Sequence, residues 1–350
     1  MTLFARRFLI AGGMFLALAA AAAAGEVAAP AAAQGFTFFA YGDSRSVPAG
    51  HAQVAAAILA EAERLKQFTF VVHSGDFAST GAGEPEYEQE FFGPAAALLG
   101  RMKLLPVRGN HDTESEVFDR RLLPPGRPAS AGAACDYCFD HGSVRLLVFD
   151  QYEPASTGDA RMKWLEQKLL EAPDRWRLVA FHEPIYATGH HGSNVPFREL
   201  IEPVLVKGQV HAVFCGHNHD YERTKPVKGV TYLTSGGGGA PFSEERWGTS
   251  EEWSVKREGG LHFLTVKVSP DKLAISALKA LPGGQAEVFD SVEVPRDCGW
   301  PAAAAASAKV SYGREHNPWK QRFVGGGIAL LLLALGAAVV RRLARRKPAA

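Results

Sequence analysis

Short apolar runs alternate with stretches of helical periodicity over the first two thirds of the chain. A short apolar run bounded by turn-forming residues is typical of a buried strand. Helices are expected between several of these runs; in residues 52–65, for example, Val54, Ile58 and Ala62 recur at helical spacing. The strands predicted here are 36–41, 68–74, 103–108, 144–150, 176–181 and 212–215, and the helices are 52–65, 87–99 and 161–170.

From residue 230 the pattern changes to strands with little helix between them. The strands predicted in this part are 230–235, 262–268, 272–278 and 288–294. Together the two patterns predict an α/β body in residues 36–296, with a second, more antiparallel sheet supplied by its later half. Residues 297–319, rich in alanine and polar residues, are expected to form a linker or stalk.

The N-terminal segment has the layout of a bacterial export signal. Arg6 and Arg7 precede an apolar, alanine-rich run at residues 8–24, so we predict a signal peptide at residues 1–25. The arginine pair also fits a twin-arginine signal, which would mean export after folding. Two arginines occur in ordinary signals as well, and both versions stay open.

Near the other end, residues 323–340 carry no charge. As a helix they would reach about 27 Å, close to the thickness of a hydrocarbon core. We predict a transmembrane helix there; the alternative is a buried C-terminal helix. The basic tail at residues 341–350 then lies in the cytoplasm. The body is therefore expected to be exported and anchored in the cytoplasmic membrane, on its periplasmic or extracellular side.

The charge balance of the 350 residues changes once these ends are set aside. Lys plus Arg is 38 and Asp plus Glu is 37, for a net charge of +1. Nine of the basic residues lie in residues 1–25 and 320–350, which hold no acid, so the middle carries 29 basic against 37 acidic residues. An acidic body argues against a nucleic-acid partner. The sequence does not indicate an oligomeric state.

Four cysteines are compatible with disulfides in an exported protein. Cys135 and Cys138 form a Cys-x-x-Cys in a turn-like segment, where we predict a local disulfide. The alternative, a zinc clip, would need two more ligands. Cys215 ends an apolar strand and is predicted to be a buried thiol, while Cys298 has no evident partner.

Side chains that can bind metals follow five of the predicted strands. The carboxyl ends of strands in such folds open on one crevice, so we expect these side chains to converge. Taken singly, each has an ordinary role in a turn or loop; the ordered set argues for a site. Two carboxylates, one amide oxygen and three imidazoles suit a pair of divalent or trivalent ions such as Fe, Mn or Zn. The candidate ligands are Asp43, Asp76, Asn110, His182, His217 and His219.

The order of these motifs resembles the calcineurin-like metallophosphoesterase superfamily. Two Gly-Asp pairs, a Gly-Asn-His-Asp, a strand-end histidine and a Gly-His-x-His follow one another, and the match spans about residues 36–290. Residues 182–186, 216–223 and 232–239 are most similar to the purple acid phosphatase branch. The resemblance implies a four-layer α/β/β/α sandwich. It also implies a metal-dependent phosphoric ester hydrolase that acts on small phosphate esters through a hydroxide bridging two ions. Monoesters are favoured as substrates, and diesters stay open.

The resemblance also implies a role for each candidate. Asp76 would bridge the ions, and His111 would sit beside the substrate phosphate and protonate the leaving group. Either His190 or His191 would assist it. The first ion would be held by Asp43 and His219, and the second by Asn110, His182 and His217.

Two departures from the family pattern matter. Arg45 stands where many members have a histidine ligand, and arginine does not bind metals. Arg45 is expected either to contact the substrate phosphate or to pair with a neighbouring acid. Ser79 stands where purple acid phosphatases supply a tyrosine, so we expect an enzyme that is not purple. The weakened first site leaves one alternative open, a non-catalytic metal-binding or scaffold member of the same fold.

Overall fold

The computed structural model of the chain describes residues 35–124, 135–156, 158–242, 251–301 and 311–312. These residues belong to the second of two units, 33–350. The predicted export signal (1–25), transmembrane helix (323–340) and basic tail (341–350) lie outside the described residues, as does most of the predicted linker. Among the helices within the described ranges, none has the length and apolar character needed to cross a membrane.

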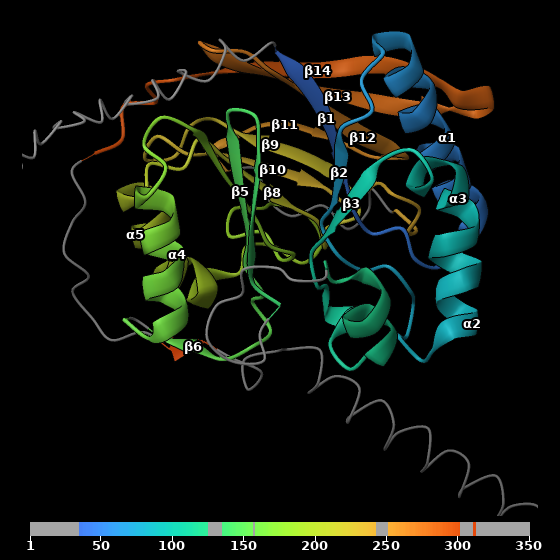
Figure 1. The fold of residues 1–350 in the computed structure, drawn as a ribbon, viewed down its shortest axis with the longest axis horizontal. Helices are drawn as coiled ribbons and strands as arrows, with labels where there is room; N and C mark the ends of the chain where they lie inside the picture. The colour runs from blue at the N-terminus through green and yellow to red at the C-terminus, as the bar shows by residue number, and fades with distance from the viewer. Residues whose placement is uncertain (1–34, 125–134, 157, 243–250, 302–310, 313–350) are drawn as a thin grey trace, which may run out of the picture. The chain divides into compact units, whose positions relative to one another are not determined.

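Six strands form the first sheet, in the order β14-β13-β12-β1-β2-β3 (Figure 1). β1, β2 and β3 are parallel neighbours, whereas β12, β13 and β14 pair antiparallel and continue the sheet from the other side of β1. The strands are β1 (Phe36–Tyr41), β2 (Phe70–His73), β3 (Lys103–Pro106), β12 (His262–Val268), β13 (Lys272–Leu281) and β14 (Gln285–Pro295).

Seven strands form the second sheet, in the order β11-β9-β10-β8-β7-β5-β4. Its centre is parallel, from β10 through β8 and β7 to β5, and its edges are antiparallel. The strands are β4 (Tyr137–His141), β5 (Val144–Val148), β7 (Trp176–Ala180), β8 (Ala212–Cys215), β9 (Tyr221–Thr224), β10 (Thr231–Ser235) and β11 (Ser254–Glu258). A separate two-stranded pairing joins β6 (Ala155–Ser156) to β15 (Ser311–Tyr312).

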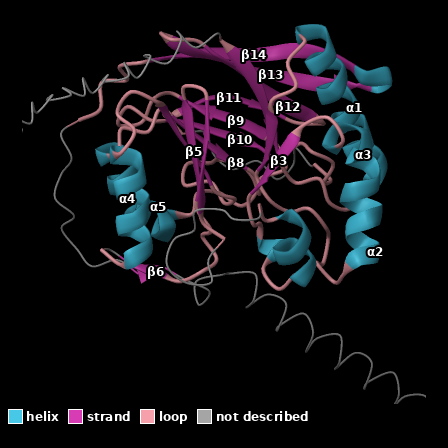
Figure 2. Cartoon of the chain, viewed as in Figure 1, coloured by secondary structure: helices cyan, strands magenta, loops and turns pink. Residues whose placement is uncertain are grey.

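Helices cover the outer faces of both sheets (Figure 2). On the first sheet, Ile58 and Leu98 of the covering helices pack with Phe39. On the second sheet, Leu165 and Phe197 occupy the equivalent layer. The helices are α1 (Pro48–Leu65), α2 (Glu84–Tyr87) and α3 (Gly93–Leu99) beside the first sheet, and α4 (Ala160–Leu170) and α5 (Val195–Lys207) beside the second.

The main core lies between the sheets. Strand β1 shows how the sequence builds it: Phe38 and Ala40 face the second sheet, while Phe39 and Tyr41 face the helices. Side chains alternate along a strand, so a strand buried on both faces needs apolar residues at every position. The four layers implied by the family resemblance are therefore present among the described residues.

Every predicted strand is present; five are shorter than predicted, three have the predicted bounds and two, β13 and β14, are longer. The expectation that the later half supplies its own antiparallel sheet is wrong, because β12 to β14 extend the first sheet while β9 to β11 extend the second. The helix predicted at 87–99 is interrupted by a π-helical segment, Glu88–Phe92. Helix α5 is not among the predicted helices. Pro203 lies inside it, and a proline in the interior of a segment normally indicates that no helix continues through it.

The predicted disulfide between Cys135 and Cys138 is also wrong, since both sulfurs are thiols. Residues three apart in an extended segment point to opposite sides. Cys135 accordingly joins the cluster around Phe118, whereas Cys138 packs against the cluster of α4 and α5. A zinc clip between them is disfavoured by the same geometry. Cys215 is a buried thiol, which confirms that prediction.

Candidate metal centre

The candidate ligands lie on loops that follow β1, β2, β3, β7 and β8. The first three strands belong to one sheet and the last two to the other, so the site forms where the two sheets present the same edge. A direct link joins the two sides: the backbone N–H of His217 donates to both carboxylate oxygens of Asp43, at 3.1 and 2.9 Å.

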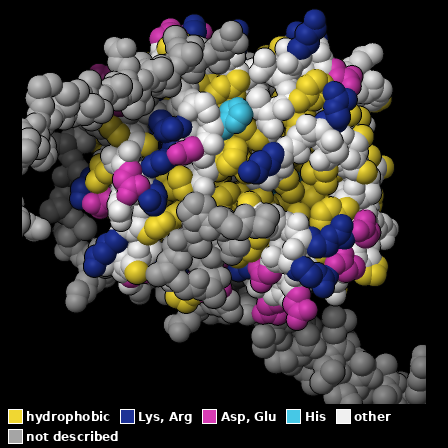
Figure 3. All heavy atoms as spheres, viewed as in Figure 1, with side chains coloured by type: hydrophobic (Ala, Val, Ile, Leu, Met, Phe, Trp, Pro, Cys, Tyr) yellow, Lys and Arg dark blue, Asp and Glu magenta, His cyan; other side chains and the backbone are white. Residues whose placement is uncertain are grey.

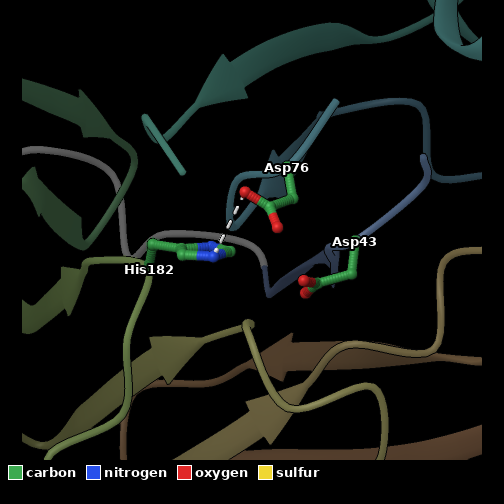
Figure 4. A group of neighbouring side chains, drawn as sticks. All are labelled: Asp43, Asp76 and His182. Carbon is green, nitrogen blue, oxygen red and sulfur yellow. Dashed lines mark ion pairs between the residues drawn. The ribbon is translucent and has the colours of Figure 1, made fainter. Parts of the chain in front are cut away.

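Asp43, Asp76 and His182 form the centre of the cluster (Figure 4). Their donor atoms lie within 4.8 Å of one another, and all three side chains are buried. Nε2 of His182 is 3.3 Å from Oδ1 of Asp76. Figure 4 shows both carboxylates and the imidazole directed toward a common point.

Asn110 and His217 complete one side of this cluster. Oδ1 of Asn110 lies 3.1 Å from Nε2 of His182 and 2.9 Å from Nδ1 of His217. The two ring nitrogens are themselves 3.3 Å apart. The three donors assigned to the second ion by the family resemblance therefore converge, next to Oδ1 of Asp76.

His219 lies on the other side, with its Nε2 3.7 Å from Oδ1 of Asp43. Arg45 reaches the same place: its Nε donates to Oδ2 of Asp76 at 3.2 Å, and its Nη2 lies 3.3 Å from Nε2 of His219. Arg45 is thus paired with a candidate ligand carboxylate, as one of its two predicted roles requires.

Backbone carbonyls fix the orientation of three histidine rings. Nδ1 of His182 lies 2.7 Å from the carbonyl oxygen of Ser74, and Nδ1 of His219 lies 2.8 Å from that of Pro241. Nδ1 of His111 contacts the carbonyl oxygen of Ser79 in the same way. A carbonyl oxygen only accepts, so each Nδ1 carries a proton and each ring turns its Nε2 toward the site, the orientation of metal-binding histidines.

The backbone at three candidate ligands is strained. Asp43, Asp76 and His217 have φ of 59°, 60° and 68°, in the left-handed region that side chains other than glycine seldom adopt. Such strain persists only where the surrounding structure over-determines it, and it gathers at functional sites. Gly109 allows the loops to approach this closely, because a Cβ there would collide with the carboxylate of Asp76.

Asp112 is a site residue that the sequence analysis placed in a motif but gave no role. Its buried carboxylate accepts hydrogen bonds from the backbone N–H groups of Asp76 and Gly109, each at 2.9 Å, and from that of Phe77 at 3.3 Å. The hydroxyl of Tyr87 donates to it at 2.9 Å. Asp112 therefore ties the loop after β2 to the loop after β3.

Glu90, from the π-helical segment, has a similar role that no motif signalled. Its Oε2 accepts from the backbone N–H of Ser46 at 2.9 Å and from that of Ser79 at 2.8 Å. Ser46 and Ser79 each lie three residues after a candidate ligand, so Glu90 joins the loops that follow β1 and β2. Ser79 uses its hydroxyl on the same carboxylate, at 2.9 Å.

The electrostatics of the cluster favour cations. Burial raises the pKa of the Asp43 carboxyl well above its ordinary value, and the charge of Asp76 adds to this. Burial would also raise the pKa of Asp76, but the neighbouring His182 and His111 hold it well below its usual range. Burial lowers the pKa of His182, yet Asp76 outweighs it and raises that pKa to about 10. Two buried carboxylates beside oriented imidazoles form a donor set that fits a metal centre.

The predicted catalytic histidines lie at the rim. His111 is 21% exposed, and its Nε2 is 3.9 Å from Oδ2 of Asp76. The ring of His191 packs on the ring of His217 with centroids 4.3 Å apart, whereas His190 is exposed and contacts the ring of His191 at 4.5 Å. Of these two, His191 is the one placed against the candidate ligands.

Comparison with known proteins agrees with this geometry. The family model for the calcineurin-like phosphoesterases matches residues 38–221, which contain all the candidate ligands. The chain belongs to this family. The resemblance to this family that the sequence motifs indicated is thereby confirmed.

Within the family, purple acid phosphatases are among its similar relatives. Purple acid phosphatase 21 of Arabidopsis thaliana is 27% identical over 198 residues, which are 50% of this chain and 45% of that protein. The Fe(3+)-Zn(2+) purple acid phosphatase 12 of the same plant is 29% identical over 135 residues, 37% of this chain and 28% of that protein. The chain spans less than half the length of either relative.

A solved structure, purple acid phosphatase PPD1 from yellow lupin, has the same fold. It superposes with a TM-score of 0.60 at 17% identity, covering 79% of this chain and 58% of that one. At this identity the likeness shows the fold of the family and no more.

Proposed function

We propose that this calcineurin-like phosphoesterase hydrolyses phosphate esters at a two-ion centre. The observation that carries the proposal is the convergence of the other five candidate ligands around Asp76, with the imidazoles of His182 and His219 oriented from behind by backbone carbonyls. Bound ions of this class, Fe, Mn or Zn, polarise phosphoryl oxygens and supply an activated water as the nucleophile. The family match and the purple acid phosphatase relatives support this reading.

In this proposal Asp76 would help to hold both ions. Its Oδ1 lies beside His182 and its Oδ2 faces the opposite side, toward Arg45, so one carboxylate presents an oxygen to each half of the cluster. The donors for the first ion are Asp43 and His219, and those for the second are Asn110, His182 and His217.

His111 supplies the proton that the leaving oxygen requires. Its Nδ1 donates to the carbonyl oxygen of Ser79, so Nε2 is the atom that exchanges the proton, and this atom lies at the partly exposed rim of the site. A histidine within hydrogen-bond reach of the leaving group can act as the general acid. His191, packed on His217, is the second candidate, and its neighbour His190 lies further out.

The substrate class and the location extend the same proposal. The name of the relatives, acid phosphatase, supports small phosphomonoesters rather than diesters as the substrate class of this chain. On the face drawn in Figure 3, acidic and basic side chains are interspersed. A surface that binds nucleic acid usually carries a basic patch instead. The export signal and the C-terminal helix predicted from the sequence would place the reaction at the outer face of the membrane.

A panel of aryl phosphomonoesters and diesters, assayed with the metal-reconstituted chain, tests the proposal. Asp76→Asn should lose both activity and bound metal, whereas His111→Ala should lose rate and keep the metal. Asp271→Asn, an exposed aspartate in the turn between β12 and β13, is the matched control and should keep both. Protein that holds two ions and cleaves no ester would favour the non-catalytic alternative.

A further inference from the structure

Arg45 makes contacts that the family pattern does not provide for. Its Nε donates to Oδ2 of Asp76 at 3.2 Å and its Nη2 lies 3.3 Å from Nε2 of His219. Its Nη1 donates to Oγ of Ser46 at 3.1 Å. The side chain is only 17% exposed. All three guanidinium nitrogens are therefore engaged within the loop cluster, and two of them hold atoms that the first ion would need.

Arg45 and the first ion would use the same atoms, Nε2 of His219 and Oδ2 of Asp76. His219 uses Nδ1 toward the carbonyl oxygen of Pro241, at 2.8 Å, so Nε2 accepts the hydrogen bond from Arg45 through its lone pair. A metal ion would bind through the same lone pair. A single lone pair accepts a guanidinium N–H or coordinates an ion, but not both.

The two carboxylate oxygens of Asp76 have different partners. Oδ1 lies 3.3 Å from Nε2 of His182 and accepts from the backbone N–H of His111 at 3.1 Å, on the side of the second ion. Oδ2 is the oxygen bound by Arg45. The guanidinium is thus a cation placed between the donors of the first ion, while the donors of the second ion converge on the other oxygen.

We infer that the guanidinium of Arg45 and the first metal ion compete for Oδ2 of Asp76 and Nε2 of His219. The second-ion site then fills first and tightly, and the first-ion site fills only when Arg45 is displaced. This inference rests on the proposed function, because it uses its assignment of donors to two ions. It adds an order of loading that the donor set alone would not give.

The size of the effect follows from charge. Arginine stays protonated, so an ion entering the first site must displace a full positive charge and then remain near it. Two like charges about 4 Å apart in a partly buried site repel strongly enough to change an affinity by more than tenfold. A displaced guanidinium could turn to the substrate phosphate, which would reconcile its two predicted roles.

Titration of the metal-free full-length chain with Mn²⁺ tests the inference without reference to activity. Equilibrium dialysis with elemental analysis counts the ions, and electron paramagnetic resonance separates isolated from spin-coupled Mn²⁺. The wild type should bind one ion tightly and a second at least about tenfold more weakly. Arg45→Ala should tighten the weaker ion by about tenfold or more, and Arg45→His should tighten it further by adding an imidazole ligand.

Two further variants sharpen the comparison. Arg45→Lys keeps the charge and should leave binding at the first-ion site weak. Arg101→Ala removes a surface arginine, paired with Glu63, and should reproduce the wild-type titration. Circular dichroism of each variant checks the fold; if Arg45→Ala does not fold, the comparison of Arg45→His with Arg45→Lys decides the question in the same way.

Equal affinities for both ions in the wild type would overturn the inference. An unchanged weaker affinity in both Arg45→Ala and Arg45→His would overturn it as well, while leaving the proposed function standing. If instead the wild type and every variant bound no Mn²⁺ tightly, the second-ion donors would be wrongly assigned, and the proposed function would fall together with the order of loading.

Discussion

Asp112 offers the sharpest test of how the fold holds the candidate ligands in place. Its Oδ2 accepts from the backbone N–H groups of Asp76 and Gly109, and its Oδ1 accepts from that of Phe77 and from the hydroxyl of Tyr87. The carboxylate is fully buried. Replacing Asp112 by alanine therefore leaves three buried amides without their acceptor.

The expected loss can be estimated from these contacts. A buried donor deprived of its partner costs about 1 to 3 kcal/mol, so the three amides of Asp112→Ala should lower the free energy of unfolding by about 3 to 9 kcal/mol. The total free energy of unfolding of a native protein is only about 5 to 15 kcal/mol. Asp112→Asn keeps one acceptor oxygen but turns an amide NH₂ toward the N–H of Phe77, and should cost about 1 to 3 kcal/mol.

The Asp112 variants should also bind metal more weakly. Groups that orient metal ligands from behind change metal affinity by about 10- to 100-fold when they are mutated. Asp112 positions the backbone of Asp76, so we expect a loss of this size in Asp112→Asn.

The assay is urea unfolding followed by circular dichroism, with metal content measured after dialysis. Burial raises the pKa of the Asp112 carboxyl to about 7, so the measurements belong near pH 8, where it is ionised. Glu116→Gln, an exposed carboxylate in the same segment, is the control. If Asp112→Asn kept wild-type stability and wild-type metal content, the loops would not depend on this carboxylate.

Three further predictions follow from the same structure. Gly109→Ala should lose metal and lower the free energy of unfolding, because the added Cβ collides with both the carboxylate and the backbone nitrogen of Asp76; elemental analysis and urea unfolding check this. Iron-loaded wild type should show no tyrosinate charge-transfer band in its visible spectrum, since Ser79 replaces the tyrosine; a purple protein would contradict this. Burial lowers the pKa of His211 from 6.5 to about 4, so unfolding takes up a proton as the pH falls through this window. His211→Gln should flatten the loss of unfolding free energy there by up to about 1.4 kcal/mol per pH unit; an unchanged slope would refute it.

The strand ends were predictable because their pattern has a direct physical cause. Strands buried on both faces need continuous apolar runs, and a run that stops at Gly42 and Asp43, or at Gly75 and Asp76, marks where the chain leaves the core. Parallel strands then bring these ends to one edge. Convergence of the six candidate ligands could therefore be expected from the sequence, although the contact of Arg45 with Nε2 of His219 could not.

What the sequence could not indicate are contacts made to backbone groups. The carboxylate of Glu90 holds the N–H groups of Ser46 and Ser79, and nothing in the periodicity of its helix marks it as different from the neighbouring Glu88. The Cys-x-x-Cys failed for a related reason: spacing suggested proximity, but the extended backbone directs Cys135 and Cys138 into different clusters.

Glu90 and Asp112 stabilise the strained backbone of the loops that carry Asp43 and Asp76. A residue such as Asp43 or Asp76 in the left-handed region costs about 1 to 3 kcal/mol, and the chain would relax if nothing opposed it. Glu90 and Asp112 oppose it by binding the amides of these loops, and the buried strands β1 and β2 fix where the loops begin. The backbone of the site is thus set before any ion arrives. Loading then requires a side chain to move rather than a loop, and Arg45 is the side chain whose position demands it.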